Sequence, residues 1–551
     1  MEKRKLKVLI GQINPIVGDL DYNTQKIIQI TKSNQNADII IFPEMAIVGY
    51  PLMDHILDPI IQKKNLACIE ELKQLDSSPT IIVGTFTEPP ELKEKFQNFY
   101  NSAIIIEGKE ILYIENKRLL PNYDVFDERR YFSFDDKFKT IEIKGVQVGI
   151  LICEDLWDQQ YEVKVSKNLV QNGAELLVVI NASPYHIKKL EDRQKLVSQK
   201  SKKFQIPIIY VNMVGGLDEI VYDGQSFITN HFGQIIHKAK AFKEDTPLIE
   251  INIDKPNQRD EKIYKTDWRE EVVEALKLNL YDYFYKSNIF DGVVLGLSGG
   301  IDSAFTSYIC SKALGSEKVT NIMMPTRFTS QDSLDFSRQL CENLGSKYII
   351  HPIDDVFECF EASLRKELGK MPFDVADENL QARIRANILM YYSNKFNWLL
   401  VSTGNKSEIA VGYCTLYGDT SGGKNIPGDL LKVQIYDICE WINRREEVIP
   451  REIITRPPTA ELKNDQKDSD TLPPYKILDQ ILQEIINKGI GGELEILTKK
   501  GIDIDTINKV RNLYLNAEFK RRQIVQSIKV SPNAFGIGRR YPVLKKINFK
   551  Q

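Results

Sequence analysis

Three stretches in the first half of the chain each contain one reactive side chain, two of them at the end of an apolar run and the third just before a proline turn. Glu44 follows "IIIFP", Lys117 lies in "ENKRLLPNY", and Cys153 follows "VGILI". A cysteine thiolate can attack an amide carbon, and a nearby carboxylate can take the thiol proton and later return it to the leaving ammonia. A lysine can stabilise the tetrahedral oxyanion. If the three side chains converge, they predict a site that cleaves an amide bond.

A cysteine–histidine pair is the alternative design for the same reaction. That design needs a nucleophile turn flanked by glycine, and "LICED" contains no glycine. The chain has five histidines, and none of them lies in a comparable motif. The sequence therefore favours the carboxylate, lysine and thiol arrangement.

A glycine-rich turn, "GLSGGIDS" at residues 296–303, separates an apolar run from a helix-like segment in the second half. Gly296, Gly299 and Gly300 let the backbone approach a ligand, and the start of a helix directs free N–H groups at an anion. The turn lacks the Gly-Lys-Ser/Thr ending of the lysine-bearing phosphate loop. Asp302 either caps the helix or holds Mg²⁺ against a phosphate oxygen, and the sequence leaves both roles open.

The elements that must position these residues are short β-branched runs alternating with helix-like segments. In the first half many runs are apolar on almost every residue, as are strands covered on both faces. Reactive residues at the carboxyl ends of such strands gather at one sheet edge. In the second half the alternation predicts a doubly wound parallel sheet.

The change to a charged, helical composition predicts a linker at residues 253–268, between a first domain at 1–252 and a second domain at 269–551. Two polar stretches of the second domain, 417–431 and 457–474, lack the alternation of strands and helices. Long polar loops inside a compact domain are often lids or disordered segments.

The bulk composition excludes several classes of protein. The 73 Lys and Arg against 76 Asp and Glu leave a net charge of −3, which argues against nucleic acid and against an anionic membrane surface as partners. The seven scattered cysteines include no CxxC pair, which opposes a disulfide framework or a zinc site. Without a secretory leader or a membrane span, the chain is expected in the cytoplasm.

The motifs of the first half resemble those of the nitrilase (carbon–nitrogen hydrolase) superfamily over about residues 5–250. "FPE", "KRLLPNY" and "CEDLW" match its three catalytic motifs. The resemblance implies a four-layer α-β-β-α sandwich, with Glu44 as general base, Lys117 as oxyanion partner and Cys153 as nucleophile. The glutamine-using branch of the superfamily further implies three substrate contacts. A second acidic residue is also expected to assist. The contacts are Tyr123, Ser183 and Lys189, and the acidic residue is either Glu128 or Glu154.

The turn "SGGIDS" resembles the pyrophosphate loop of adenylating amidotransferases, which split ATP into AMP and diphosphate. Three further stretches, at 377–394, 399–419 and 516–523, extend the resemblance to the NAD synthetase family over about 270–545. It implies a Rossmann-like domain of the ATP pyrophosphatase type. The implied ATP contacts are Gly296, Leu297, Ser298, Gly299, Gly300, Ile301, Asp302, Ser303 and Thr403. The implied contacts of deamido-NAD are Asn379, Glu408 and Lys520, with Asp302 and Glu408 at Mg²⁺.

The two resemblances together imply linked reactions in one chain. The first half would hydrolyse glutamine, and the second would use ATP and Mg²⁺ to adenylate deamido-NAD, with ammonia passing internally and displacing AMP. Relatives with this architecture form homo-oligomers, often octamers. Another adenylating amidotransferase, acting on tRNA or a nucleotide, is the alternative, but the near-neutral charge and absent CxxC oppose it. A non-catalytic adenine-nucleotide sensor would not need Glu44, Lys117 and Cys153.

Overall fold

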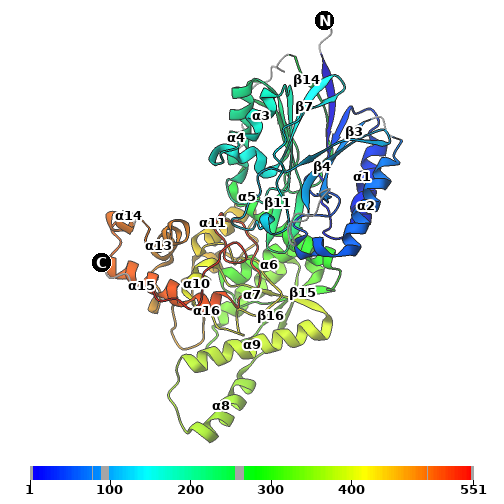
Figure 1. The fold of residues 1–551 in the computed structure, drawn as a ribbon. Coiled ribbons are helices and arrows are strands. Elements are labelled where there is room, and N and C mark those ends of the chain that lie inside the picture. Colours follow the sequence, from blue (N-terminus) through cyan, green and yellow to red (C-terminus); the bar gives the residue numbers. More distant parts are fainter. Residues whose placement is uncertain (1–3, 77–78, 89–98, 255–265, 493, 548–551) are drawn as a thin grey trace. The chain divides into compact units, whose positions relative to one another are not determined.

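The computed structural model describes the chain except for residues 1–3, 77–78, 89–98, 255–265, 493 and 548–551 (Figure 1). The chain divides into two compact units. Unit 1 is Met1–Gly215 with Val221–Thr266, and unit 2 is Gly216–Ile220 with Asp267–Gln551. Most of the expected linker at 253–268 lies outside the described residues, between strand β14, which ends at Asn252, and helix α5, which begins at Trp268.

Unit 1 is built from two six-stranded sheets that pack face to face, with helices on their outer faces (Figure 1). This confirms the four-layer α-β-β-α sandwich. The first sheet has the order β14-β1-β2-β3-β4-β5, with bounds Leu248–Asn252, Lys5–Ile10, Ile39–Ile41, Thr80–Thr87, Tyr100–Glu107 and Glu110–Asn116. The second has the order β13-β12-β9-β8-β7-β6, with bounds Ile235–Lys238, Phe227–Thr229, Ile208–Asn212, Leu176–Asn181, Val146–Ile152 and Ile141–Ile143.

In the part of unit 1 that the structure describes, four helices cover the sandwich. Helices α1 (Leu20–Ser33) and α2 (Pro59–Lys73) lie beside the first sheet, and α3 (Val165–Gln171) and α4 (Lys189–Phe204) lie on the second. The pair β10 (Val214–Leu217) and β11 (Ile220–Asp223) forms a separate two-stranded sheet.

Strand β7 shows why its sequence is apolar on nearly every residue. Val148, Ile150 and Ile152 belong to the core between the two sheets, whereas Leu151 belongs to the core beneath α3 and α4. Side chains alternate between the faces of a strand, so a strand buried on both faces needs apolar residues at every position. This buried strand ends at the residue before Cys153.

Unit 2 contains a five-stranded parallel sheet of order β17-β16-β15-β18-β19, which confirms the doubly wound arrangement. The order reverses at β15, and ligands of such sheets bind where the order reverses, beyond the carboxyl ends of the strands. The strands are β15 (Gly292–Gly296), β16 (Val319–Met323), β17 (Lys347–Ile350), β18 (Trp398–Ser402) and β19 (Lys424–Asn425).

Helices surround this sheet and extend beyond it. Those associated with the sheet are α5 (Trp268–Ser287), α6 (Ile301–Leu314), α7 (Gln331–Leu344), α8 (Asp354–Leu368), α9 (Val375–Phe396), α10 (Lys406–Val411), α11 (Lys432–Ile442) and α12 (Arg451–Thr455). The C-terminal helices α13 (Tyr475–Lys488), α14 (Leu494–Lys499), α15 (Ile504–Asn516) and α16 (Glu518–Arg521) follow, and α13 and α15 supply most of a separate apolar core.

The two polar stretches of unit 2 differ in structure. Residues 424–430 of the first are buried, and β19 adds a strand to the sheet by pairing with β18, so the expectation of a polar loop is wrong there. In the second stretch, residues 457–462 line a cavity at the sheet edge. Among the described residues, no helix combines the length and the apolar character that a membrane crossing requires.

Candidate active sites

The carboxylate of Glu44 and the ammonium of Lys117 form a buried ion pair in unit 1. Lys117 Nζ lies 2.8 Å from Glu44 Oε1, and both side chains are almost completely buried. Asn101 Nδ2 donates to the same oxygen at 2.7 Å, and the backbone N–H of Ala182 donates to Oε2 at 2.8 Å. The predicted convergence of Glu44 and Lys117 is therefore correct, and three donors fix the orientation of the carboxylate.

Glu128, in a short 3₁₀ helix at Glu128–Arg130, is the acidic residue beside this pair. Its Oε1 lies 2.7 Å from Lys117 Nζ and accepts a hydrogen bond from the Tyr50 hydroxyl at 2.8 Å. Burial raises the pKa of Glu128 to about 7, helped by the charge of Glu44 and opposed by Lys117. Of the two acidic residues that the sequence left open, Glu128 is therefore the one in contact with the lysine.

Cys153 begins a short helical turn immediately after β7. Its φ of +46° lies in the left-handed region, which costs a residue other than glycine about 1–2 kcal/mol. Asp155 holds this turn against the segment that follows Lys117, because its Oδ1 accepts from the N–H groups of Arg118 and Leu119 at 3.0 and 2.8 Å. The strand end that carries the thiol and the segment that carries Lys117 are thereby fixed to each other.

The charges around Cys153 control its ionisation. Burial raises the pKa of the thiol well above its usual value, and the charge of Glu44 adds to this, whereas Lys117 favours the thiolate. Burial also disfavours the charge of Lys117, but Glu128 and Glu44 outweigh it and hold the pKa of that lysine well above its usual value. Lys117 therefore stays charged, and the thiol keeps its proton until a base removes it.

The three expected glutamine contacts lie on segments around this cluster. Tyr123 is half exposed, and its hydroxyl donates to Glu154 Oε2 at 2.9 Å. Ser183 is buried, two residues beyond β8. Lys189 begins α4, with its Nζ 4.2 Å from the centre of the Trp157 ring. Glu154, the other candidate for the assisting acid, accepts from the hydroxyls of both Tyr123 and Tyr161.

In unit 2 the turn at 296–303 joins β15 to α6. Gly299 has a φ of +77°, and a Cβ at this position would lie 2.6 Å from the carbonyl oxygen of Ser333, so only glycine fits. Ser303 Oγ donates to the carbonyl oxygen of Gly300 at 2.9 Å and accepts from Ser298 N. The turn is thus pre-formed at the amino end of a 14-residue helix, where backbone N–H groups favour an anion.

The N-cap role considered for Asp302 is wrong. Helix α6 begins at Ile301, with Gly300 in an extended conformation as its N-cap and no side chain capping it. Asp302 already lies in the first turn, and its carboxylate forms an ion pair with Lys432 and accepts from Asn405 Nδ2. The early helix start leaves this carboxylate available for other contacts.

A cavity of about 300 Å³ opens at the carboxyl ends of β15, β16 and β18. Thr403 and Glu408 line it, and burial raises the pKa of Glu408 to about 8, opposed by Lys432. The residues of the turn that also line it are Gly296, Leu297, Ser298, Gly300, Ile301, Asp302 and Ser303. The structure thus brings together Thr403, Glu408 and nearly all of the predicted ATP loop.

Asn379 and Lys520 lie elsewhere in the described part of unit 2 and are not among the residues that line this cavity. Asn379 Oδ1 accepts from the Thr415 hydroxyl at 2.7 Å, and Lys520 Nζ donates to the carbonyl oxygens of Gly412 and Cys414 at 2.8 and 2.7 Å. Both side chains therefore hold the segment at 412–415.

Several cavity residues escaped prediction from the sequence. Lys432 contacts both Asp302 and Glu408, with its Nζ 3.4 Å from Glu408 Oε1. Arg456 donates to the carbonyl oxygen of Gly299 in the turn. Neither lies in a short motif of the sequence, and no expected helix or strand covers Lys432. Arg385, which lies in the 377–394 stretch of the resemblance but had no role assigned to it, donates to the carbonyl oxygen of Met324 and also lines the cavity.

Comparisons with known proteins assign each half of the chain to a family. The carbon–nitrogen hydrolase family model matches residues 7–258, and the NAD synthase family model matches residues 272–524. The chain is 39% identical to the glutamine-dependent NAD(+) synthetase of Synechocystis, over 97% of this chain and 98% of that protein. It is also 39% identical to the Acinetobacter baylyi protein of that name, over 98% of each chain.

Solved structures lead to the same family. The glutamine-dependent NAD+ synthetase of Acinetobacter baumannii in complex with ADP superimposes with a TM-score of 0.78 at 36% identity, covering 98% of each chain. The Cytophaga hutchinsonii protein has a TM-score of 0.83 at 21% identity, which speaks for the fold alone. The fold and the sites define a carbon–nitrogen hydrolase joined to an NAD synthase. More specifically, the chain belongs to the glutamine-dependent NAD(+) synthetases.

Proposed function

We propose that Cys153 releases ammonia from glutamine in unit 1, and that unit 2 uses this ammonia to convert deamido-NAD to NAD⁺. Glu44 takes the proton of the Cys153 thiol, and the thiolate attacks the side-chain amide carbon of glutamine. The C–N bond of the tetrahedral intermediate then breaks. Glu44 returns the proton to the leaving ammonia, and water hydrolyses the resulting thioester to glutamate.

Lys117 stabilises the oxyanion, and Glu128 assists by keeping Lys117 charged and in place. The support is the pair of contacts from Lys117 Nζ to Glu44 and Glu128, at 2.8 and 2.7 Å. Glutamine is held by the other three predicted residues of unit 1, Tyr123, Ser183 and Lys189. Their hydroxyl and ammonium groups are suited to the amino-acid end of this substrate.

In unit 2 the turn at 296–303 binds the ATP phosphates, and Thr403 contacts the same nucleotide. The nicotinate carboxylate of deamido-NAD attacks the α-phosphate, and diphosphate leaves. Ammonia then displaces AMP from the adenylate, giving NAD⁺. Asn379, Glu408 and Lys520 contact deamido-NAD. Asn379 and Lys520 also hold the 412–415 segment in place.

The carboxylates of Asp302 and Glu408 both contact Lys432 Nζ and therefore lie near each other. They fit Mg²⁺, because they offer the oxygen ligands that this ion prefers. The ATP phosphates and water would complete its coordination, and the ion would neutralise phosphate charge. Among the described residues no group of three or more metal-binding side chains occurs.

Segment 457–474 closes over the bound substrates and keeps water from the adenylate. Its residues 457–462 already line the cavity. Closure agrees with the contacts of Glu461, whose Oε1 accepts from the hydroxyls of Ser330 and Ser333 at 2.8 and 2.7 Å, at the start of α7.

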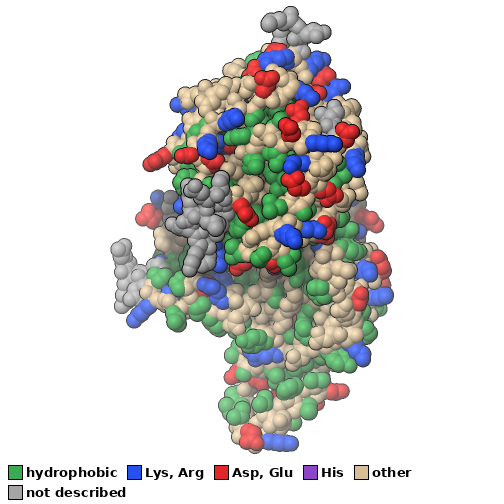
Figure 2. All heavy atoms as spheres, turned by 45° about the vertical axis from the view of Figure 1, so that its right-hand side comes forward, with side chains coloured by type: hydrophobic (Ala, Val, Ile, Leu, Met, Phe, Trp, Pro, Cys, Tyr) green, Lys and Arg blue, Asp and Glu red, His purple; other side chains and the backbone are tan. Residues whose placement is uncertain are grey.

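The protein acts in the cytoplasm as a homo-oligomer, for which an octamer is the expected size. Helix α8 leaves an apolar face uncovered, formed by Val356, Phe360, Leu364 and Leu368 at intervals of four residues. Figure 2 shows apolar side chains grouped at the lower end of this view, where Figure 1 places α8. Oligomers bury faces of this kind, and light scattering with a Phe360→Glu variant would test this one.

The observation that carries the proposal is the buried contact of Lys117 with both Glu44 and Glu128, beside the turn of Cys153. The test incubates the protein with deamido-NAD, ATP, Mg²⁺ and glutamine, and measures NAD⁺, AMP and glutamate. The expected result is formation of all three, with NAD⁺ and AMP in equal amounts. Glutamate without AMP would refute the synthetic half, and AMP without glutamate would refute the glutaminase half.

A further inference from the structure

Arg193, on α4, is completely buried and donates most of its hydrogen bonds to the segment at 183–184. Its Nε donates to Ser183 Oγ at 3.2 Å, and its Nη2 donates to the carbonyl oxygens of Ser183 and Pro184 at 2.7 and 3.0 Å. Nη1 donates to Asp223 Oδ1 at 2.7 Å. Three of these four bonds hold the segment that carries a proposed glutamine contact.

A buried guanidinium is costly unless it is paired, so packing alone does not account for Arg193. Asp223, at the end of β11, supplies the countercharge and is itself held by Gln225 Nε2 at 2.9 Å. Burial works against the charge of Arg193, but Asp223 outweighs it, and the pKa of Arg193 lies above its usual value. The planar fork of arginine reaches Asp223 and two carbonyl groups at once, which a lysine ammonium on its flexible stem does not reproduce.

The segment has two distinct attachments. Ala182 N–H contacts the general base Glu44 and directly follows β8 (Leu176–Asn181). Ser183, one residue further, is held by Arg193 and by Asn212 Oδ1, which accepts from its N–H at 2.9 Å. Arg193 thus fixes the substrate side of the segment, whereas strand β8 fixes the side that contacts the base.

Helix α4 also carries Lys189, one turn before Arg193. Residues four apart lie on the same face of a helix. Lys189 Nζ lies over the Trp157 ring, so the first turns of α4 reach both Trp157 and the Ser183 segment. One rigid helix therefore sets the positions of two of the three proposed glutamine contacts.

We infer that Arg193, anchored by Asp223, is a positioning residue for glutamine recognition. It fixes the position of Ser183 relative to Lys189, and it takes no part in the chemistry at the Cys153 thiol. This inference rests on the proposed function of Ser183 and Lys189. It predicts a change in glutamine affinity with little change in the rate at saturation, which a general loss of stability would not produce.

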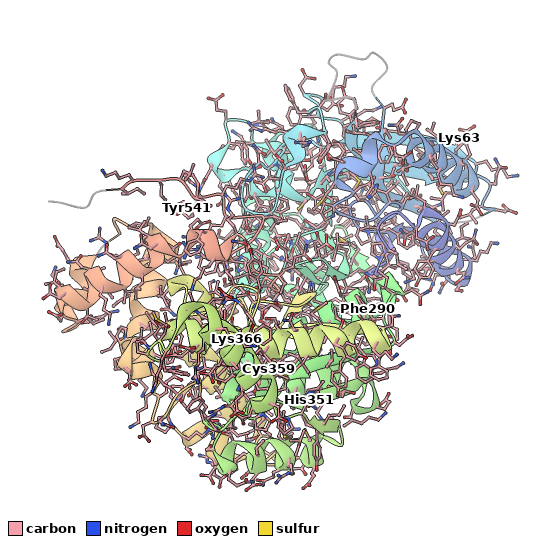
Figure 3. The ribbon with its side chains drawn as sticks, turned by 90° about the horizontal axis from the view of Figure 1, so that it is seen from below. Lys63, Phe290, His351, Cys359, Lys366 and Tyr541 are labelled. Atoms are coloured by element: carbon pink, nitrogen blue, oxygen red, sulfur yellow. The ribbon has the colours of Figure 1, made fainter. Side chains whose placement is uncertain are left out.

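The experiment compares Arg193→Lys with the wild type in the full-length enzyme. Glutamine binding is measured as protection of Cys153 from iodoacetamide, followed by mass spectrometry of the Cys153 peptide. The peptide readout is needed because Cys359 on α8 is exposed and will also react (Figure 3). We expect the KM and the protection constant for glutamine to rise about 10-fold to 100-fold, as for loss of hydrogen bonds to a charged group.

The same variant should keep the glutaminase kcat within about threefold and the alkylation rate without glutamine within about twofold, given that Arg193 does not hold Glu44. Asp223→Asn keeps the arginine, weakens its anchor and should raise the KM in the same direction. Lys200→Met is the matched control, because Lys200 is a buried cation of the same helix that contacts Asp158 and Ser166 instead. It should leave the glutamine KM unchanged.

A glutamine KM that changes less than about twofold in Arg193→Lys, or a fall in kcat at unchanged KM, would overturn the inference. An equal rise of KM in Lys200→Met would also overturn it, because any buried cation of α4 would then suffice. Ser183→Ala tests the proposed glutamine contact of Ser183 separately from the positioning role of Arg193. If it leaves KM unchanged while Arg193→Lys raises it, the proposed contact of the Ser183 hydroxyl fails, and Arg193 then positions glutamine through the backbone at 183–184 and through Lys189.

Discussion

The ammonium of Lys432 forms an ion pair with the carboxylate of Asp302, although 130 residues separate them in the chain. Burial works against the charge of Lys432, but Asp302 and Glu408 outweigh it and hold its pKa above the usual value. A permanent cation therefore lies beside the turn proposed to bind the ATP phosphates. When both acids are ionised, the two carboxylates and the ammonium together carry one net negative charge, which favours a metal cation beside them.

Substitution of Asp302 should stop synthesis whichever nitrogen source is supplied. We expect Asp302→Ala to lower NAD⁺ formation from glutamine and from ammonia by at least about 100-fold, because a charge proposed to hold Mg²⁺ is lost. Asp302→Asn keeps the shape and loses the charge, and it should fail similarly. Initial rates at saturating ATP and Mg²⁺ measure this, with glutamine hydrolysis in the same samples as the control for folding. Normal synthesis by either variant would reduce Asp302 to a structural partner of Lys432.

Removal of the Cys153 thiol should separate the two reactions. Cys153→Ala is expected to abolish NAD⁺ formation from glutamine but to leave formation from ammonia within about twofold, because the nucleophile serves only the amide cleavage. Cys68→Ala provides a matched control, since Cys68 is a buried thiol of the same unit whose Sγ lies 3.8 Å from the carbonyl oxygen of Leu20. If Cys153→Ala lost both activities while remaining folded, the proposed division of labour would be wrong.

Site residues whose signals lie next to them in the chain were predictable, whereas those defined by a contact with a residue distant in the chain were not. Cys153 was predictable, because the buried strand before it and the turn after it are both local signals. Lys432 was not, because its partner Asp302 meets it only through the fold. The N-cap of α6 is Gly300, two residues before the expected Asp302, and apolar patterning does not resolve a helix start that finely.

The sequence was equally unable to rank Glu128 against Glu154, since both are acidic residues near a predicted catalytic motif. Their roles differ because Glu128 lies against Lys117, whereas Glu154 accepts from two tyrosine hydroxyls. The polar stretch at 417–431 misled for a related reason. Its glycines and polar residues are typical of loops, yet pairing of β19 with β18 places Lys424 in the interior.

The ionisation of Glu128 should appear in the pH dependence of glutamine hydrolysis. Its pKa is raised to about 7, first by burial and then by Glu44, so it is protonated below that pH and ionised above it. When Glu128 is protonated, Lys117 loses one of the two carboxylates that keep it charged and in place for the oxyanion. The glutaminase kcat should therefore rise as the pH increases through about 7.

Glu128→Gln removes this titration and should flatten the profile around pH 7. It should also lower the kcat about 10-fold to 100-fold at pH 8, the range given by loss of one charged hydrogen bond to the lysine. The measurement is kcat for glutamate release from pH 5.5 to 8.5. An unchanged inflection in the variant would assign the titration to another group. Synthesis from ammonia at each pH serves as the control.

Asn101 should affect the rate of amide cleavage and leave glutamine binding unchanged. Its Nδ2 donates to Glu44 Oε1 at 2.7 Å, and its carbonyl oxygen accepts from Lys117 N at 2.8 Å. Asn101→Ala keeps the backbone contact and removes the side-chain donor, so the general base loses one of three orienting bonds. We expect the glutaminase kcat to fall about 10-fold, with the glutamine KM within about twofold, because Asn101 holds the base and not the substrate.

The matched control for this change is Asn65→Ala. Asn65 is also buried in unit 1, and its Nδ2 donates to the carbonyl oxygen of Phe86 at 2.9 Å. Loss of either amide should lower the free energy of unfolding by about 1–3 kcal/mol, because each leaves a buried group without its partner. Only Asn101→Ala should lower kcat. Equal losses of kcat in the two variants would mean that stability, and not the orientation of Glu44, limits the reaction.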